Sequence, residues 1–198
     1  MTKYFVIYGF GSGLSMFDGF KPLPAPKCIA YIYKYSDMWR HFDRGLYDFI
    51  KRYIYVPLGG SRVSPWRLAV TSLLCFVFIY IWHGVDVSIL AFCAANFIGV
   101  NCERLGSKID SEVKARSVIT NSISMFVYER FKVVVSMPLL ALSLLGVFTF
   151  LTGNIEVGKL YVERMLYNSF PVPLLPLMLV FYAFIQSSKA IKINEKYA

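Results

Sequence analysis

The sequence predicts an all-α, polytopic membrane protein, and three observations support this fold class. Apolar residues make up 57% of the 198 residues, whereas soluble domains usually contain about 45–50%. Charged residues make up only 17%, against a usual share of about 25%. Four long runs contain no Asp, Glu, Lys or Arg at all. A soluble domain of this size would lack the polar side chains that are needed to cover its surface.

The first 20 residues contain an apolar segment, from Tyr4 to Phe17, that is interrupted by three glycines. It has no basic region at its start and no small-residue cleavage site in the right place, so a signal peptide is not indicated. We interpret the segment as the end of a membrane helix or as a re-entrant segment. The backbone of such a segment needs neighbouring protein to satisfy its hydrogen bonds. We therefore expect this chain to be part of a longer protein.

Residues 36–57 are predicted to form an amphipathic helix at the membrane interface. Ser36 or Asp37 can cap its start, and Pro57 with the glycines that follow ends it. Apolar residues recur at the spacing of one helix face, with charged residues on or near the other face. The apolar face contains Phe42, Leu46, Phe49, Ile50 and Tyr53. A purely interfacial position would account for this pattern without any further function.

The four charge-free runs predict transmembrane helices at about 68–85, 87–103, 133–152 and 171–188. The runs themselves contain 18, 16, 23 and 24 residues. A helix of 18 residues is about 27 Å long, close to the hydrocarbon thickness of a bilayer, which is about 30 Å. The alternative is four buried helices of a large soluble core, which four such runs in so short a chain disfavour.

The Lys and Arg content of the connecting segments predicts the orientation of these helices. Nine basic residues lie from Lys21 to Arg67, six in segment 103–132 and three in the C-terminal tail, whereas loop 153–170 has two and the turn at Asp86 has none. The basic segments and the C-terminus are therefore predicted to be cytosolic. The net charge of +9 then reflects topology and contact with anionic membrane lipid. No nucleic-acid-binding motif is present, so no nucleic acid is expected as a partner.

Two ionisable residues are candidates for function. His83 lies near the end of an apolar run, where an ionisable side chain is costly and often functional. Asp43 lies beside the apolar stripe of the amphipathic helix, with Arg40 and Arg44 within one turn. From spacing alone, a local ion pair between Asp43 and one of these arginines is the favoured interpretation.

Both residues lie in motifs that resemble the core of the membrane-bound O-acyltransferase family. The motifs are Met38-Trp39-Arg40-His41-Phe42-Asp43, Gly45-Leu46, Arg52-Tyr53-Ile54-Tyr55-Val56-Pro57-Leu58-Gly59-Gly60-Ser61 and Trp82-His83-Gly84. The likeness continues through Gly99-Val100 with Glu103, and through Glu156-Val157-Gly158-Lys159 with Tyr161. Members of the family are much longer than 198 residues. The resemblance therefore implies that residues 1–198 are the C-terminal part of a single domain of this family.

The resemblance is to the branch of the family that acts on hedgehog-type proteins, which has Asp where most relatives have Asn at position 43. It implies a multi-pass endoplasmic reticulum enzyme that transfers palmitate from palmitoyl-CoA to the N-terminal cysteine of a secreted hedgehog-type protein. His83 matches the family's catalytic histidine, and Asp43 matches its second catalytic position. By the orientation above, Asp43 faces the cytosol and His83 the lumen, and a tunnel would join them. The alternative is a catalytically incomplete fragment or paralogue that acts as a membrane scaffold or regulator.

The chemistry of this reaction suits the two candidate residues. An α-amine has a pKa near 8, so a neutral histidine can accept its proton during attack on the thioester. A thioester is already activated, so no metal site is expected. An ionised Asp43 cannot stabilise an oxyanion, and we expect it to orient groups or to hold a proton. Direct attack by the amine, and attack by the cysteine thiolate followed by an S-to-N shift, both stay open.

Two further motifs concern cofactors. In this branch of the family the position of Cys28 contacts haem, so the resemblance implies a haem site, although a juxtamembrane cysteine more often suggests palmitoylation. Residues 153–159 fit the phosphate-loop pattern G-x-x-x-x-G-K. The next residue is Leu160, which lacks the hydroxyl that binds magnesium, and no strand is expected before the motif. GTP binding is therefore not predicted.

Overall fold

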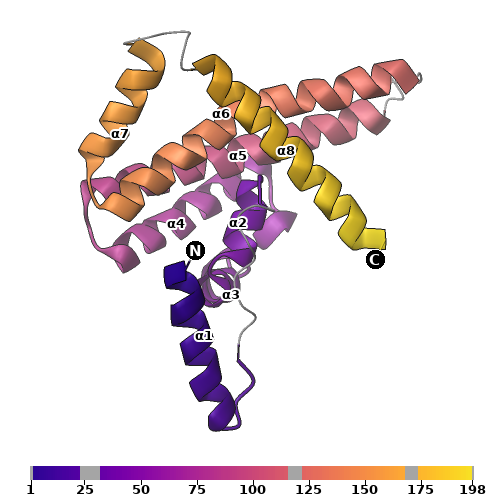
Figure 1. The fold of residues 1–198 in the computed structure, drawn as a ribbon. Coiled ribbons are helices and arrows are strands. Elements are labelled where there is room, and N and C mark those ends of the chain that lie inside the picture. Colours follow the sequence, from indigo (N-terminus) through magenta and orange to yellow (C-terminus); the bar gives the residue numbers. More distant parts are fainter. Residues whose placement is uncertain (1, 23–31, 116–121, 168–173, 198) are drawn as a thin grey trace.

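The computed structural model describes residues 2–22, 32–115, 122–167 and 174–197, and these contain helices but no strand (Figure 1). This helical content confirms the all-α class that the sequence predicts. In chain order the elements are α1 (Thr2–Phe17), α2 (Tyr35–His41), α3 (Arg44–Ile50), the π-helical η2 (Lys51–Tyr55), the 3-10 helix η3 (Gly60–Arg62), α4 (Pro65–His83), α5 (Val87–Ala115), α6 (Ser122–Thr152), α7 (Ile155–Val162), the π-helical η4 (Glu163–Tyr167) and α8 (Leu174–Tyr197).

Helices α4, α5 and α6 form the centre of the molecule. Helices α5 and α6 pack along each other, α4 packs on α5, and α8 crosses α6 (Figure 1). Helix α4 begins with Pro65, at a position where a backbone N–H would have no hydrogen-bond partner within the helix. It stops at Gly84, whose φ of 100° is favourable only for glycine. Helix α7 folds back on α6, with Gly158 directly against Thr149. The C-terminal ends of α4 and α6 and the start of α7 therefore lie close together.

Two buried clusters hold these elements in place. The first joins α3, α4 and α5 and contains Ile50, Cys75, Phe76, Ile79, Phe92 and Cys93. The second joins α6 to α8 and contains Val133, Met137, Phe181 and Ile185. Burying each such side chain is worth about 1.5–3 kcal/mol when the reference is water. Within a bilayer the same contacts act mainly through close packing, because lipid tails are as apolar as the side chains.

Two of the four predicted crossings coincide with helices that are long and apolar enough to span a membrane. In the described part of the chain these are Pro65–His83 and Ser124–Thr152. The predicted crossing at 87–103 forms the first half of α5, and the fourth lies in α8, where the apolar stretch is the shorter Leu175–Ile191. Four crossings therefore stay a prediction, while two candidate spans are established.

The interfacial segment departs from the prediction of one helix over 36–57. The chain leaves the helix at Phe42 and starts a new one at Arg44, so α2 and α3 are separate. The cause is Asp43, which has extended backbone angles and whose side-chain oxygen accepts a hydrogen bond from Leu46 N at 3.0 Å. This is an N-cap, which begins a helix and interrupts one that would otherwise continue.

Helix α1 is consistent with the first of the two interpretations of residues 1–20, the end of a membrane helix, and the choice between the two stays a prediction. The three glycines do not break it, and Thr2–Phe17 is one uninterrupted helix. A Cβ at Gly9, Gly11 or Gly13 would meet no atom within 4 Å. Figure 1 shows α1 standing away from the central helices, consistent with this open surface.

Charged side chains join three helices far from the end that holds His83. Asp110 of α5 lies 3.0 Å from both Lys114 and Lys132, and Glu129 of α6 contacts Lys132 and lies 3.4 Å from Lys189 of α8. We call these five residues the charged cluster. Burial alone raises the pKa of Asp110, but the hydrogen bonds from Lys114 and Lys132 outweigh burial and hold that pKa at about 2. The cluster is therefore fully ionised at neutral pH and ties α5, α6 and α8 together.

Candidate active site

Helix α2 is fastened to α5 at two levels by polar contacts. The Ser36 hydroxyl donates to the Glu103 carboxylate, and the Trp39 Nε1 donates to the Asn96 Oδ1 at 3.1 Å. Asn96 is 1% exposed, and its Nδ2 donates to the Phe92 carbonyl at 2.8 Å. Both polar ends of this buried amide are therefore satisfied, one within α5 and one by α2.

A chain of aromatic rings links α2 to His83. The Trp39 ring lies 6.0 Å from the Phe92 ring, Phe92 stacks on Phe150 at 4.6 Å, and Phe150 meets the His83 ring edge-on at 5.2 Å. These four rings come from α2, α5, α6 and α4. Edge-to-face and offset contacts of this kind fix ring orientation as well as distance. The imidazole of His83 is thus oriented from one side by Phe150, while the residue as a whole remains exposed.

Asp43 lies at the break between α2 and α3 and is not held by the neighbouring arginines. Arg40 pairs with Asp37 at 4.0 Å, and Arg44 pairs with Asp48 at 3.8 Å. The local ion pair that spacing favours for Asp43 is therefore wrong. Instead, the Asp43 carboxylate caps α3 through Leu46 N, which orients it without neutralising its charge.

Asp43 and His83 lie near each other in space, although 40 positions separate them in the chain. The Asp43 carboxylate is close enough to interact electrostatically with the His83 imidazole. The assignment of the two residues to opposite sides of the membrane stays a prediction. A carboxylate and an imidazole are both side chains that general acid–base chemistry uses.

A cavity of about 570 Å³ is lined by Asp43 and by Phe150, and Phe150 contacts His83. Most of the other lining side chains are apolar. Its volume lies in the range of about 300–1,000 Å³ that is usual for ligand pockets. Its lining side chains are Ile32, Tyr33, Lys34, Tyr35, Met38, Trp39, Phe42, Asp43, Phe92, Leu140, Ser143, Leu144, Val147, Phe150, Leu151, Val180, Phe181 and Phe184.

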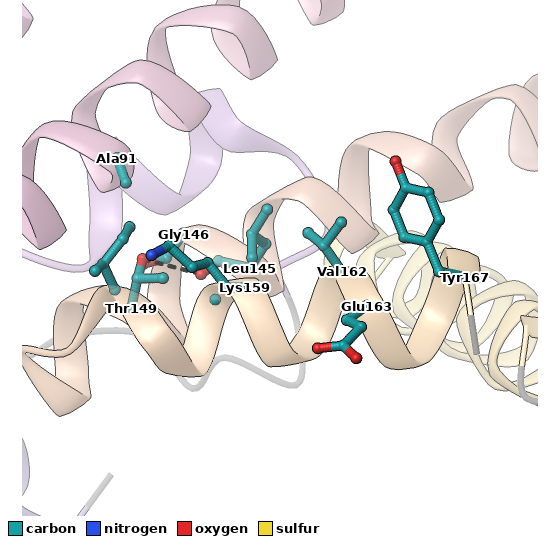
Figure 2. A pocket seen from close by; sticks show the side chains of 10 residues that line it. Ala91, Leu145, Gly146, Thr149, Lys159, Val162, Glu163 and Tyr167 are labelled. Atoms are coloured by element: carbon teal, nitrogen blue, oxygen red, sulfur yellow. Dashed lines mark hydrogen bonds between the residues drawn. The ribbon is translucent and has the colours of Figure 1, made fainter. Parts of the chain in front are cut away.

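A second hollow of about 460 Å³ lies between α5, α6 and α7 (Figure 2). Figure 2 shows Ala91 facing it across from Val162, Glu163 and Tyr167, with Thr149 and Lys159 at its base. The Thr149 hydroxyl donates to the Gly146 carbonyl at 2.8 Å. Lys159 is paired with Glu156 at 2.6 Å. Thr149 and Lys159 are thus engaged in local contacts.

The segment that matches the phosphate-loop pattern forms a helix cap. Gly153 has a φ of 61°, and Asn154 Oδ1 accepts from Glu156 N at 2.9 Å to start α7. Helix α6 comes directly before it, whereas a phosphate loop follows a strand. Lys159, the residue that would contact phosphate, is paired with Glu156.

The haem site stays a prediction. Cys28, the predicted haem contact, lies outside the described residues. Within the described ranges, no three His, Cys, Asp or Glu side chains are grouped closely enough to hold a metal ion. The free cysteines Cys75 and Cys93 are buried in the apolar contacts between α4 and α5.

Sequence reasoning identified Asp43 and His83 but missed the residues that bring them together. Phe150 lies in an apolar run, where nothing distinguishes it from its neighbours. Asn96 did carry a signal, because it is one of two amides, with Asn101, within a charge-free run. Its partner Trp39 lies 57 positions away, so the contact itself could not be read from local spacing.

Comparison with known proteins identifies the family. The model of the membrane-bound O-acyltransferase family matches residues 1–147, a range that contains both Asp43 and His83. The chain belongs to the membrane-bound O-acyltransferase family. This membership places the chain in a family of membrane acyltransferases.

Within that family the chain is similar to protein-cysteine N-palmitoyltransferases. It is 30% identical to protein-cysteine N-palmitoyltransferase HHAT of Mus musculus over 170 residues, which are 86% of this chain and 34% of that protein. It is 37% identical to protein-cysteine N-palmitoyltransferase Rasp of Drosophila melanogaster over 102 residues, 52% of this chain and 20% of that protein. It is also 24% identical to the HHAT-like protein of Mus musculus over 95% of this chain and 37% of that protein. The chain thus spans about a third or less of the length of these curated relatives.

Proposed function

We propose that this chain forms the acyl-binding and catalytic part of an enzyme that transfers palmitate from palmitoyl-CoA to the N-terminal cysteine of a secreted hedgehog-type protein. The observation that carries the proposal is the mainly apolar cavity of about 570 Å³ that is lined by Asp43 and by Phe150, the ring that contacts His83. An acyl chain needs an apolar channel, and its thioester needs a polar group and a base at the end of that channel. Similarity to two protein-cysteine N-palmitoyltransferases supports the choice of donor and acceptor.

His83 acts in this proposal as the general base. The acceptor amine has an ordinary pKa near 8, so a useful fraction of it is neutral at neutral pH. This neutral amine attacks the thioester, and it must lose one proton as the carbon–nitrogen bond forms. A neutral imidazole accepts that proton, and the CoA thiolate departs as the tetrahedral intermediate collapses to an amide. The edge of Phe150 holds the imidazole, and the residue's exposure leaves it accessible to an acceptor.

Asp43 acts in this proposal as an orienting group. One of its oxygens is occupied by Leu46 N, which leaves the carboxylate fixed in direction at the edge of the cavity. An ionised carboxylate repels an oxyanion, so Asp43 does not stabilise the tetrahedral intermediate directly. The fixed carboxylate instead orients the substrate or a partner side chain by hydrogen bonding.

The location of the enzyme follows from the same reasoning. The distribution of Lys and Arg supports a cytosolic C-terminus and cytosolic basic segments. An acceptor that is secreted meets the enzyme in the lumen of the endoplasmic reticulum, so we assign the protein to that membrane.

A transfer assay tests the proposed function. Membranes containing the protein are supplied with palmitoyl-CoA and a peptide that begins with the cysteine of a hedgehog-type protein, and hydroxylamine-resistant palmitoyl-peptide is measured. Amide product above that of membranes without the protein is expected. The same peptide with an acetylated N-terminus is the control and should give no resistant product. Absence of amide product from the free peptide would contradict the proposal.

The same assay separates the two chemical routes. A peptide with alanine in place of its first cysteine retains the amine but lacks the thiol. Direct attack by the amine predicts that this peptide is still acylated. Initial attack by the thiolate, followed by an S-to-N shift, predicts that it is not.

A further inference from the structure

We propose that Tyr35 sets the length of the acyl chain that the cavity accepts, an inference that rests on the proposed function. The proposed wall lies at the end of the cavity that is away from Asp43 and His83. Tyr35 lines the cavity and is only 4% exposed. Its ring is fixed from two sides, so it forms a wall that cannot swing aside.

The first constraint on Tyr35 is the backbone of α5 at Gly99. A Cβ built on Gly99 would collide with three atoms of the Tyr35 ring. The ring therefore lies directly on the helix backbone, at a point where only glycine leaves enough room. A side chain at position 99 would push the ring away from α5 and into the cavity.

The second constraint is a hydrogen bond to α6. The Tyr35 hydroxyl donates to the Leu139 carbonyl at 2.9 Å, and the Ser143 hydroxyl lies within hydrogen-bonding reach of the same oxygen. Burial raises the pKa of Tyr35, which keeps its hydroxyl a donor. With the ring pressed on α5 and the hydroxyl bound to α6, Tyr35 bridges the two helices.

The position of this bridge along α6 makes it the end wall. The α6 side chains that line the cavity extend from Leu140 to Leu151, a rise of about 16 Å at 1.5 Å per residue. Phe150, which contacts His83, lies near one limit of this range. The Tyr35 hydroxyl binds at Leu139, one residue before the other limit. An acyl chain whose thioester lies beside His83 therefore meets the Tyr35 ring with its terminal methyl group.

Two substitutions move this wall in opposite directions. Tyr35→Ala removes the ring and lengthens the space, so the protein should prefer acyl chains longer than palmitoyl. Gly99→Ala pushes the ring inward and shortens the space, so the protein should prefer shorter chains. Because one methylene in an apolar pocket changes discrimination by roughly tenfold or more, each preference should shift by at least that factor.

Equilibrium binding of radiolabelled acyl-CoA to the protein in membranes tests the proposal, with lauroyl-, myristoyl-, palmitoyl-, stearoyl- and arachidoyl-CoA as probes. The expected result is a longer optimum for Tyr35→Ala and a shorter one for Gly99→Ala. Tyr35→Phe keeps the ring and should keep the wild-type order of chain lengths. Tyr167→Ala is the matched control, because it removes an equally large ring that is 78% exposed and lies outside this cavity.

The outcomes separate this inference from the proposed function. Wild-type binding of palmitoyl-CoA with unchanged length preferences in Tyr35→Ala and Gly99→Ala would overturn the role of Tyr35 alone. Absence of palmitoyl-CoA binding by the wild-type protein would overturn the proposed function and the length limit with it. If Tyr35→Ala does not accumulate in membranes, Tyr35→Leu replaces it, because leucine keeps an apolar side chain at position 35. The length preferences of Tyr35→Leu and Gly99→Ala then test the role of Tyr35.

Discussion

The two ends of the α5–α6 pair are held together by different kinds of contact. At one end, four aromatic rings connect α2, α5, α6 and α4 and lead to His83. At the other, the charged cluster connects α5, α6 and α8. The aromatic end fixes geometry without using up ionisable groups, so Asp43 and His83 remain free to act on a substrate. At the charged end three lysines contact two carboxylates, so each side chain has a partner of opposite charge and the cluster has a structural role.

We expect substitutions at the aromatic end to lower activity and substitutions at the charged end to cause only small changes in stability.

The largest expected effect is that of His83→Ala. Loss of a general base typically lowers turnover by about 100–10,000-fold, and palmitoyl-CoA binding should be little changed because His83 acts on the acceptor. Raising the pH should restore part of the rate, since more of the acceptor amine is then neutral. Turnover and acyl-CoA affinity measured between pH 6 and about 9 check this prediction.

Wild-type turnover in His83→Ala would contradict the assignment of the base. His41→Ala provides a matched control, because it removes the other histidine of the chain. It lies in α2 and does not line the cavity. A loss of turnover as large as that of His83→Ala would show that neither imidazole is specific to the chemistry.

Two substitutions of Asp43 distinguish a role of its negative charge from a role of its oxygen as a hydrogen-bond acceptor. Asp43→Asn retains an oxygen that can cap α3 through Leu46 N, whereas Asp43→Ala removes the cap at a cost of about 1 kcal/mol in stability. If the carboxylate mainly orients groups, Asn should keep most of the turnover and Ala should lose it. Thermal unfolding in detergent, measured beside turnover, separates the cap from the chemistry. An Asn variant as inactive as Ala, with wild-type stability, would show that the charge itself is needed.

Substitutions at Trp39 and Asn96 test how much the hydrogen bond between them stabilises the aromatic end. Trp39→Phe keeps an aromatic ring but leaves the buried Asn96 Oδ1 without its donor, which costs about 1–3 kcal/mol. Replacing both residues, as Trp39→Phe with Asn96→Leu, removes donor and acceptor together. The double variant should therefore be at least as stable as the single variant in thermal unfolding. A double variant less stable by the sum of the two single effects would rule out coupling between these side chains.

The smallest expected effect is that of Asp110→Asn at the charged end. Because its ion pairs are partly exposed, the expected loss of stability is about 1 kcal/mol or less at neutral pH, with turnover unchanged. The folded-state pKa of about 2 lies below the ordinary value of 3.8. The contribution of Asp110 is therefore present above pH 3.8 and is lost as the pH falls toward 2. Unfolding midpoints of both proteins should converge over that interval, and a constant difference would contradict the shift.

The helices and one catalytic candidate could be predicted because their signals are local. Charge-free runs located α4 and the apolar part of α6, and His83 stood out as an ionisable residue at the end of such a run. The C-terminal end of α5 could not be found this way, because the helix continues through polar residues to Ala115. Side-chain pairs four residues apart, Lys108 with Glu112 and Asp110 with Lys114, stabilise that extension.

The break at Asp43 and the shape of the cavity were not predictable for different reasons. Apolar residues keep their helical spacing through the break, so periodicity alone favoured one helix. The cap depends on a side chain bonding to the backbone three residues ahead, which periodicity does not report. The contact of Tyr35 with Gly99 and Leu139 joins three distant segments, and only the folded chain shows it.

The three-residue connection between α4 and α5 bears on how the chain enters its membrane during synthesis. Helix α4 is apolar enough to be inserted alone, but α5 carries Asn96 and a charged second half. With only three residues between them, α4 and the predicted crossing in α5 would enter together as a helical hairpin, so that α4 lowers the cost of inserting its partner. Asn96 already bonds to Phe92 within its own helix, and Trp39, its second partner, has been synthesised earlier. Lengthening this turn should therefore impair biogenesis before it affects catalysis.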